Sequence, residues 1–235
     1  MEELRRNYHE ELDHIRNELA LLAARVVELI PRGTAVLLDG DLEGAERIIQ
    51  GDAEIDAHSV TIEEQCIKIL ALQSPVSRDL RQVLAVFKII AEIERSADLV
   101  ANICKAARRI YGHELDPKLR GLISRMGEQA QALYVAAIEA LQEGDAAKAA
   151  AINDMDAYLD ALHKEFISAI FESHANELLD LQVGVQLAMV GRFYERIGDH
   201  AVNMGERVLF MITGKVPDHS RPDRAPIDRS AGDLS

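Results

Sequence analysis

The sequence predicts an all-α protein made of two tandem three-helix bundles related by internal duplication. Apolar residues recur at spacings of three and four along most of the chain, as at Leu12, Ile15 and Leu19, and this pattern is typical of packed amphipathic helices. The 235 residues include only 14 Gly, 6 Pro and no Trp, so turns are few and the core must be largely aliphatic. No segment of useful length alternates with period two, so we expect no sheet.

Helix caps and turns divide the chain into six predicted helices. Asp41 and Asp145 each follow a turn made of an acidic residue and Gly, and aspartates of this kind cap helix N-termini. Ser74 and Asp116 each precede a proline, which predicts an N-cap followed by proline at the first helical position. A looser break falls near residues 174–177. The predicted helices cover residues 3–38, 42–72, 75–111, 117–143, 146–172 and 177–213.

A proline lies inside the first predicted helix. Pro31 should cost about 3 kcal/mol in a helix interior. The internal repeat nevertheless continues through this position without a gap, and the equivalent residues 135–137 are ordinary helix formers. We therefore predict a kinked but continuous helix in which the carbonyl of Val27 lacks its helical partner, with a true break as the alternative.

The six helices form one unit that is used twice. A shift of 104 positions aligns residues 12–56 with residues 116–160, and beyond the next loop a shift of 101 positions aligns residues 79–102 with residues 180–203. The predicted domains are a first bundle at 1–113, a second bundle at 114–214, and a disordered polar and Pro-rich tail at 215–235.

One motif of each repeat carries side chains suited to metal binding. Glu94, Asp98 and Asn102 follow one another at four-residue spacing, which places three oxygen-bearing side chains on one helical face. Asp52 and Asp56 have the same spacing on the preceding helix. Like charges at this spacing repel, so something should compensate them. If these two helices pack antiparallel, each repeat brings four carboxylates together.

These carboxylates have three interpretations. A hard cation or a carboxylate-bridged iron or manganese centre would neutralise them. Arg95 and Arg196 could instead form ion pairs with them, and a chain of net charge -14 must also have a solvated acidic face somewhere. We expect His200, which follows Asp199, to be a hydrogen-bond partner rather than a ligand.

Composition and missing motifs exclude several functions. The net charge of -14 argues against nucleic-acid binding. No Gly-rich phosphate loop or nucleophile motif is present, so we expect no enzyme. The charged start and the absence of a long apolar run predict a cytoplasmic protein. Cys66 and Cys104 lie in apolar helical segments, where buried free thiols are expected.

Three segments resemble the signature of the PhoU family. Residues 74–81 (SPVSRDLR) and 93–98 (IERSAD) are similar to the family's pattern QP-x-A-x-DLR followed by ERIGD, and residues 195–203 (ERIGDHAVN) match its second copy more closely. The likeness covers residues 8–213 and includes the duplication. The first repeat departs from the pattern where Ser96 and Ala97 replace Ile and Gly.

The resemblance implies a negative regulator of the phosphate-starvation response that acts with the ATPase subunit of a phosphate-specific ABC transporter and with a sensor histidine kinase. It implies a homodimer that meets the membrane only through its partners. It also implies bound Fe, Mn, Zn or Mg ions. The ligands carried over are Asp52, Asp56, Glu94 and Asp98 in one repeat and Asp156, Asp160, Glu195 and Asp199 in the other, with Asn102, Asn203, His200, Arg95 and Arg196 in support.

Two competing functions stay open. The first is a helical adaptor without metal. The second is a ferritin-like di-metal protein, which needs a Glu-x-x-His motif on each of two helices. Only Glu11 and His14 have that spacing, so one of the two motifs is missing.

Overall fold

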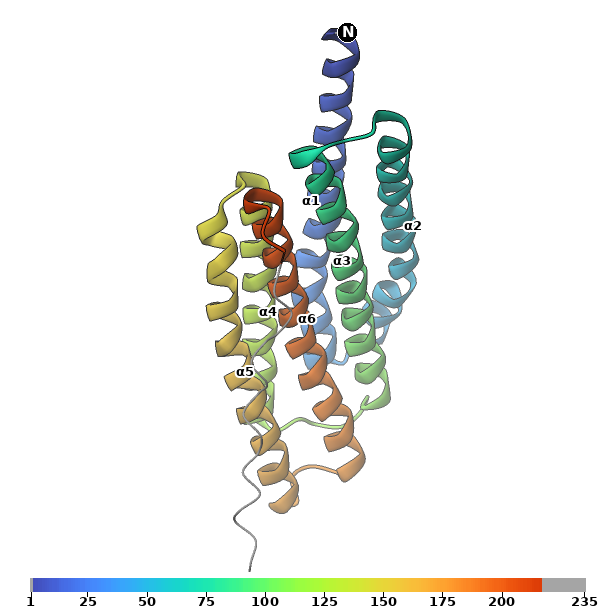
Figure 1. Cartoon of the computed structure of the whole chain (residues 1–235). Coiled ribbons are helices and arrows are strands. Elements are labelled where there is room, and N and C mark those ends of the chain that lie inside the picture. The colour runs from blue at the N-terminus through green and yellow to red at the C-terminus, as the bar shows by residue number, and fades with distance from the viewer. Residues whose placement is uncertain (1, 217–235) are drawn as a thin grey trace, which may run out of the picture.

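The computed structural model describes residues 2–216, with side chains from Tyr8 onward, and this part of the chain contains six α-helices and no strand (Figure 1). The all-α prediction is therefore confirmed. Most of the predicted tail lies outside the described residues. The helices are α1 (Glu2–Asp39), α2 (Leu42–Gln73), α3 (Ser77–Arg109), α4 (Pro117–Glu143), α5 (Ala146–Ala175) and α6 (Leu181–Thr213).

Aspartate side chains begin four of the helices. Asp41, Asp116 and Asp145 each accept a hydrogen bond from a backbone N–H in the first turn of the following helix, as predicted. Asp180 does the same for α6. This cap explains why α6 begins at Leu181 and not near residue 177.

One predicted cap is wrong. Ser74 does not begin the third helix but ends α2, as its C-cap in the left-handed conformation with φ 45°. Helix α3 begins only at Ser77, after Val76, and has no side-chain cap. None of the described helices is both long and apolar enough to cross a bilayer.

Pro31 lies within α1, which is continuous from Glu2 to Asp39, so the predicted continuity is confirmed. The carbonyl of Val27 loses its helical donor because proline has no N–H. It is not left alone, however. The side-chain amide of Gln131 on α4 donates to it at 3.2 Å and takes the place of the missing helical donor.

The helices form two groups of three, one for each repeat, that share a broad interface (Figure 1). Helices α1, α2 and α3 pack together, as do α4, α5 and α6, while α1 also contacts α4 and α3 contacts α6. Helices α2 and α5 contact only helices of their own repeat and form the two outer edges. The inner four helices therefore form a second, shared core.

The two contacts between the repeats are both antiparallel. Arg16 donates to the carbonyl of Leu141, whereas Arg120 donates to that of Leu38, so the start of α1 lies beside the end of α4. Helix α3 runs against α6 in the same way. Arg109, at the end of α3, donates to Gln186, near the start of α6.

Two buried tyrosines bridge the diagonals of this shared core. The hydroxyl groups of Tyr194 on α6 and Thr34 on α1 lie 2.7 Å apart, and Thr34 also donates to the carbonyl of Ile30. Tyr134 on α4 donates to the hydroxyl of Ser96 on α3. Both tyrosines are fully buried, so these bonds form where water cannot replace them.

Replacing Thr34 with Val should lower the free energy of unfolding by about 2 kcal/mol, because the hydroxyl of Tyr194 is left buried without a partner. The double variant Thr34→Val/Tyr194→Phe should lose less than the sum of the two single losses, because no hydroxyl then lacks a partner. Urea denaturation of the four proteins measures this coupling. Strict additivity would show that the bond does not join the repeats energetically.

Candidate metal centres

The antiparallel packing of α2 and α3 brings the predicted carboxylates of the first repeat together. The pKa of Asp52 is raised to about 6, first by burial and then by the nearby carboxylates of Asp98 and Asp56, while Lys105 opposes them. Asp98 is close enough to hydrogen-bond with Asp52. The two helices thus place carboxylates from each opposite the other.

Glu94 belongs to the same cluster. Burial raises the pKa of Glu94, and the charges of Asp56, Glu63 and Asp98 act in the same direction, against Arg95. Glu63 was not predicted from the sequence as a member of this cluster. Its position seven residues after Asp56 puts it on the same face of α2, a signal that was available. The cluster carries more negative charge than its neighbouring cations compensate.

The equivalent carboxylates of the second repeat lie deeper. Glu195 is only 1% exposed and Asp156 is also buried, whereas Asp160 and Asp199 are half-buried. Their first-repeat counterparts are more accessible, because Glu94, Asp98 and Asp56 are exposed and Asp52 is half-buried. The arginine Arg192 forms an ion pair with Glu195, and the first repeat has Ala91 at that position.

A glycine explains why Asp156 can be buried. A Cβ atom at Gly198 would lie 2.4 Å from the Oδ1 atom of Asp156 and 2.7 Å from the Cδ2 atom of Leu159, so only glycine allows α5 to approach α6 here. The equivalent residue in the first repeat is Ala97. Its methyl group occupies the space that Gly198 leaves for a carboxylate.

The donor sets of both repeats fit a hard cation. They consist of carboxylate oxygens from two adjacent helices, which are the ligands that Mg²⁺, Mn²⁺ and iron accept. Within residues 8–216, no three His, Cys, Asp or Glu side chains converge in the geometry of a metal site. A bound cation would therefore have to draw the carboxylates together across the α2–α3 contact in the first repeat and the α5–α6 contact in the second. We call these two contacts the seams.

Two predicted supporting residues contact a different carboxylate. Glu92 of α3 is buried and accepts hydrogen bonds from Asn203 at 3.1 Å and His200 at 2.6 Å, both on α6. Burial raises the pKa of Glu92, but these bonds and the charges of His200 and Arg95 outweigh it, so its pKa is lowered. His200 is thus a hydrogen-bond partner, as expected, at the interface between the repeats.

The remaining candidates lie apart from these contacts. Asn102 accepts a hydrogen bond from Lys105 at 3.1 Å, and Arg95 and Arg196 are exposed. Glu11 and His14 line a hollow of about 220 Å³ between α1 and α2, together with Gln65 and Lys68. The ammonium group of Lys68 makes this a poor place for a cation.

The fold and these residues define a class: a duplicated six-helix bundle in which two contacting helices of each repeat carry carboxylates at equivalent positions. A family model described as PhoU domain matches residues 19–107 and 123–208, one match in each repeat. The chain belongs to the PhoU family.

Relatives and solved structures agree. The chain is 34% identical over 215 residues to the phosphate-specific transport system accessory protein PhoU homolog 1 of Mycobacterium tuberculosis, covering 91% of this chain and 96% of that one. It is 27% identical to PhoU of Serratia marcescens, covering 92% and 88%. The crystal structure of the phosphate transport system regulatory protein PhoU from Streptococcus pneumoniae superposes with a TM-score of 0.83 at 26% identity, covering 90% and 99%.

The pH dependence of stability should reveal the burial of Asp52 and its repulsion by the neighbouring carboxylates. Its pKa rises from 3.8 to about 6 on folding, so its stabilising contribution is present below pH 3.8 and lost as pH rises through about 6. In metal-free protein, Asp52→Asn should therefore raise Tm by about 2 °C at neutral pH and have little effect in acid. Thermal melts across this pH range, with Asp154→Asn as an exposed control, measure it. An equal gain at all pH values would contradict it.

The buried Glu92–His200 pair gives a second prediction. His200→Leu should lower the free energy of unfolding by about 3 kcal/mol, because it leaves Glu92 buried with a weakened set of partners. The double variant Glu92→Phe/His200→Leu should recover most of that loss, since it installs the residue types that the repeat carries at the equivalent positions, Phe193 and Leu99. Chemical denaturation tests this, and a double variant no better than the single one would argue against it.

Proposed function

We propose that this chain is a regulatory accessory protein of a phosphate-specific transport system, which couples the transporter to a sensor histidine kinase and represses the phosphate-starvation response. The full-length match to proteins named as accessory proteins of that system supports the role. The proposal includes a cytoplasmic location, a homodimeric state, and contact with the membrane only through the transporter.

The observation that carries the proposal is the repeated carboxylate cluster. In the first repeat the carboxylates of α2 and α3 act on one another, and the equivalent carboxylates of the second repeat lie on the contacting helices α5 and α6. A protein that acts as a scaffold has no need to gather like charges twice at matching positions. We propose that Asp52, Asp56, Glu94 and Asp98, and equally Asp156, Asp160, Glu195 and Asp199, hold cations that neutralise these edges.

Cation binding would act through helix packing. Without a cation, the carboxylates of α2 and α3 repel one another, which the raised pKa of Asp52 reports. When a cation is bound, each seam closes and presents a fixed surface to the transporter ATPase or the kinase. The protein's part is to hold oxygen ligands on two helices whose separation responds to occupancy.

Removing ligands from one repeat at a time tests this function. Glu94→Ala/Asp98→Ala and Glu195→Ala/Asp199→Ala should each weaken metal binding in their own repeat at least about tenfold, because each removes two ligands. Elemental analysis and calorimetric titration with Mn²⁺ measure binding, and a phosphate-starvation reporter measures repression. Glu64→Ala/Asp154→Ala removes the same charge from exposed positions and should behave as wild type.

The outcomes separate the competing functions. Unchanged metal content in both double variants would eliminate the seams as metal sites. Lost metal with full repression would favour a helical adaptor whose function does not need the cation. Turnover of ferrous iron by the wild-type protein would instead favour the di-metal oxidase.

A further inference from the structure

A line of cations follows the outward side of α3, although the chain as a whole carries a net charge of -14. Arg81, Lys88, Arg95 and Arg109 are separated by multiples of seven residues, so they lie along one side of the helix about 10.5 Å apart at the closest. This side faces α6. The guanidinium of Arg81 lies near Gly214 and that of Arg109 donates to Gln186.

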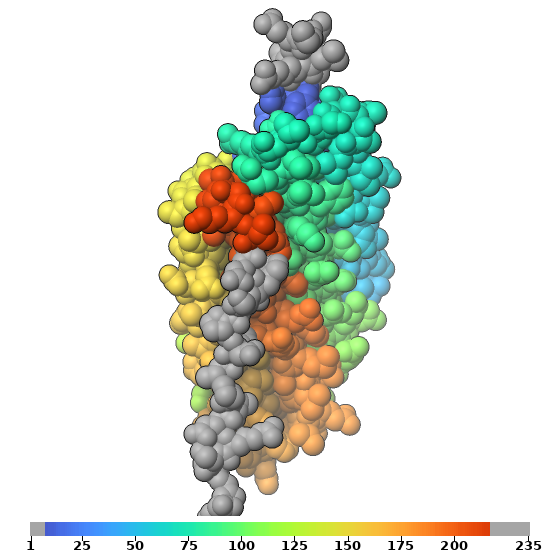
Figure 2. All heavy atoms as spheres, viewed as in Figure 1, coloured from blue at the N-terminus to red at the C-terminus, as the bar shows by residue number. Residues whose placement is uncertain are grey.

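Helix α6 adds two more cations to the same face. Arg196 is the repeat equivalent of Arg95, and Arg207 lies eleven residues, or about three turns, further along the same side. Lys88, Arg95 and Arg196 are exposed, and none of the three forms an ion pair within the described part of the chain. Figure 2 shows α3 in green and α6 in orange side by side on this face.

Two of these arginines carry polar atoms that nothing satisfies. The Nε atoms of Arg81 and Arg207 are buried and make no hydrogen bond within the described structure. Buried donors of this kind are rarely left without an acceptor. The face therefore carries two buried unsatisfied donors beside three exposed cations that form no ion pair.

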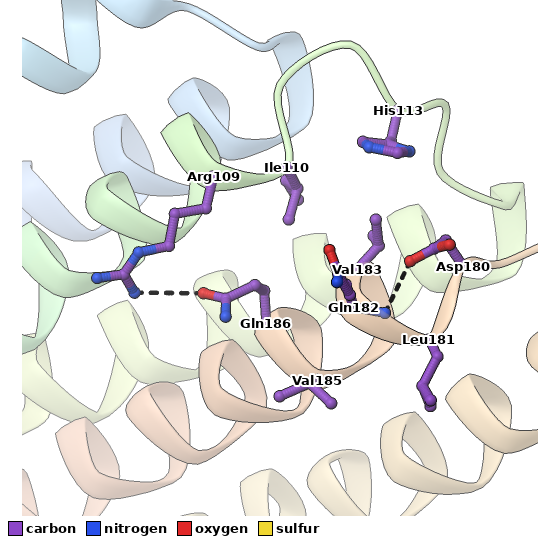
Figure 3. A pocket seen from close by; sticks show the side chains of 9 residues that line it. All are labelled: Arg109, Ile110, His113, Asp180, Leu181, Gln182, Val183, Val185 and Gln186. Atoms are coloured by element: carbon purple, nitrogen blue, oxygen red, sulfur yellow. Dashed lines mark hydrogen bonds between the residues drawn. The ribbon is translucent and has the colours of Figure 1, made fainter.

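The same face ends in a hollow of about 500 Å³ (Figure 3). Arg109, Ile110 and His113 form one wall, and Asp180 with the first turns of α6, which include Gln186, forms the other. Two apolar side chains of this wall, Leu181 and Val185, are 63% and 52% exposed, and Met189 continues the line at 43%. A cationic wall beside exposed apolar side chains suits an amphipathic ligand.

We propose that this basic α3/α6 face, defined by Arg81, Lys88, Arg95, Arg109, Arg196 and Arg207 with the hollow at Val185, docks an acidic amphipathic segment of a partner protein. Carboxylates of the segment pair with the line of cations, and one large apolar side chain enters the hollow. The carboxylate clusters lie on the flanks toward α2 and α5, so they repel an acidic segment from either side and confine it to the central line.

A nucleic acid fits this face poorly. Each strand of a duplex carries one phosphate per about 3.4 Å, whereas the line of cations on α3 offers one per about 10.5 Å. The acidic flanks and the net charge of -14 also repel a long polyanion. A phosphate backbone would also offer no apolar group to contact the apolar side chains of the hollow.

Fluorescence anisotropy of the full chain with a labelled synthetic helix tests the proposal. The probe carries Glu on one face and Leu on the other, and a Lys/Leu helix of equal length is the reference. Arg95→Glu/Arg196→Glu should weaken binding of the acidic helix roughly tenfold or more. Lys68→Glu/Lys164→Glu changes the net charge equally on α2 and α5 and should leave binding unchanged. Val185→Glu should weaken it through the hollow alone.

Several results would overturn the proposal. One is an equal loss of affinity for the acidic helix in both charge-reversal variants. The others are binding of the Lys/Leu helix, or of single-stranded RNA, as tightly as the acidic helix. Tighter binding by a chain ending at Val216 would make the protein's own tail the occupant, and a dimer dissociated by Arg95→Glu/Arg196→Glu would make it a second copy. Circular dichroism verifies folding, and the neutral pair Arg95→Gln/Arg196→Gln should show an intermediate loss.

Discussion

The shared core of α1, α3, α4 and α6 is the constraint on which the rest of the molecule depends. Each three-helix unit has an inner face that only the other unit covers, because α1 contacts α4 and α3 contacts α6. Burial of this apolar surface holds the repeats in antiparallel register, and Tyr134 and Tyr194 add hydrogen bonds across its diagonals. With the inner helices fixed, α2 and α5 are the edges where ligand chemistry can vary.

Most of the fold could be predicted from the sequence because its signals are local. Aspartates at helix starts and the spacing of apolar residues indicated six helices, and the repeat indicated which of them are equivalent. The start of α3 was misplaced because Ser74-Pro75 has the form of a cap, whereas the chain uses Ser74 in a left-handed turn that ends α2. That choice depends on the packing of both helices, which no local pattern contains.

The grouping of Asp52, Asp56, Glu94 and Asp98 was also predictable, since two i, i+4 pairs on antiparallel neighbours must meet. The partner of His200 was not identified. A charged residue among the apolar positions of α3 was the available signal, but pairing Glu92 with α6 requires the register of the two repeats.

The two copies have diverged in a physically consistent way. The second repeat has glycine at position 198 and buries Asp156 and Glu195, the latter paired with Arg192. The first repeat has Ala97 and Ala91, and three of its four carboxylates are exposed. The same arrangement thus occurs in a more closed and a more open version. The sequence showed each substitution, but their joint effect on burial needed the structure.

Pro31 has a consequence for how the halves align. Apolar packing and polar contacts both oppose a slip of one helical turn, about 5.4 Å, between α1 and α4. Val27 and Gln131 are equivalent positions in the two repeats, and because of the proline their hydrogen bond joins those of Arg16 and Arg120 between α1 and α4. Any slip would strand a carbonyl and an amide in a nonpolar seam. Pro31, a residue type that breaks helices elsewhere, here frees a backbone carbonyl whose hydrogen bond helps to fix the register between the two repeats.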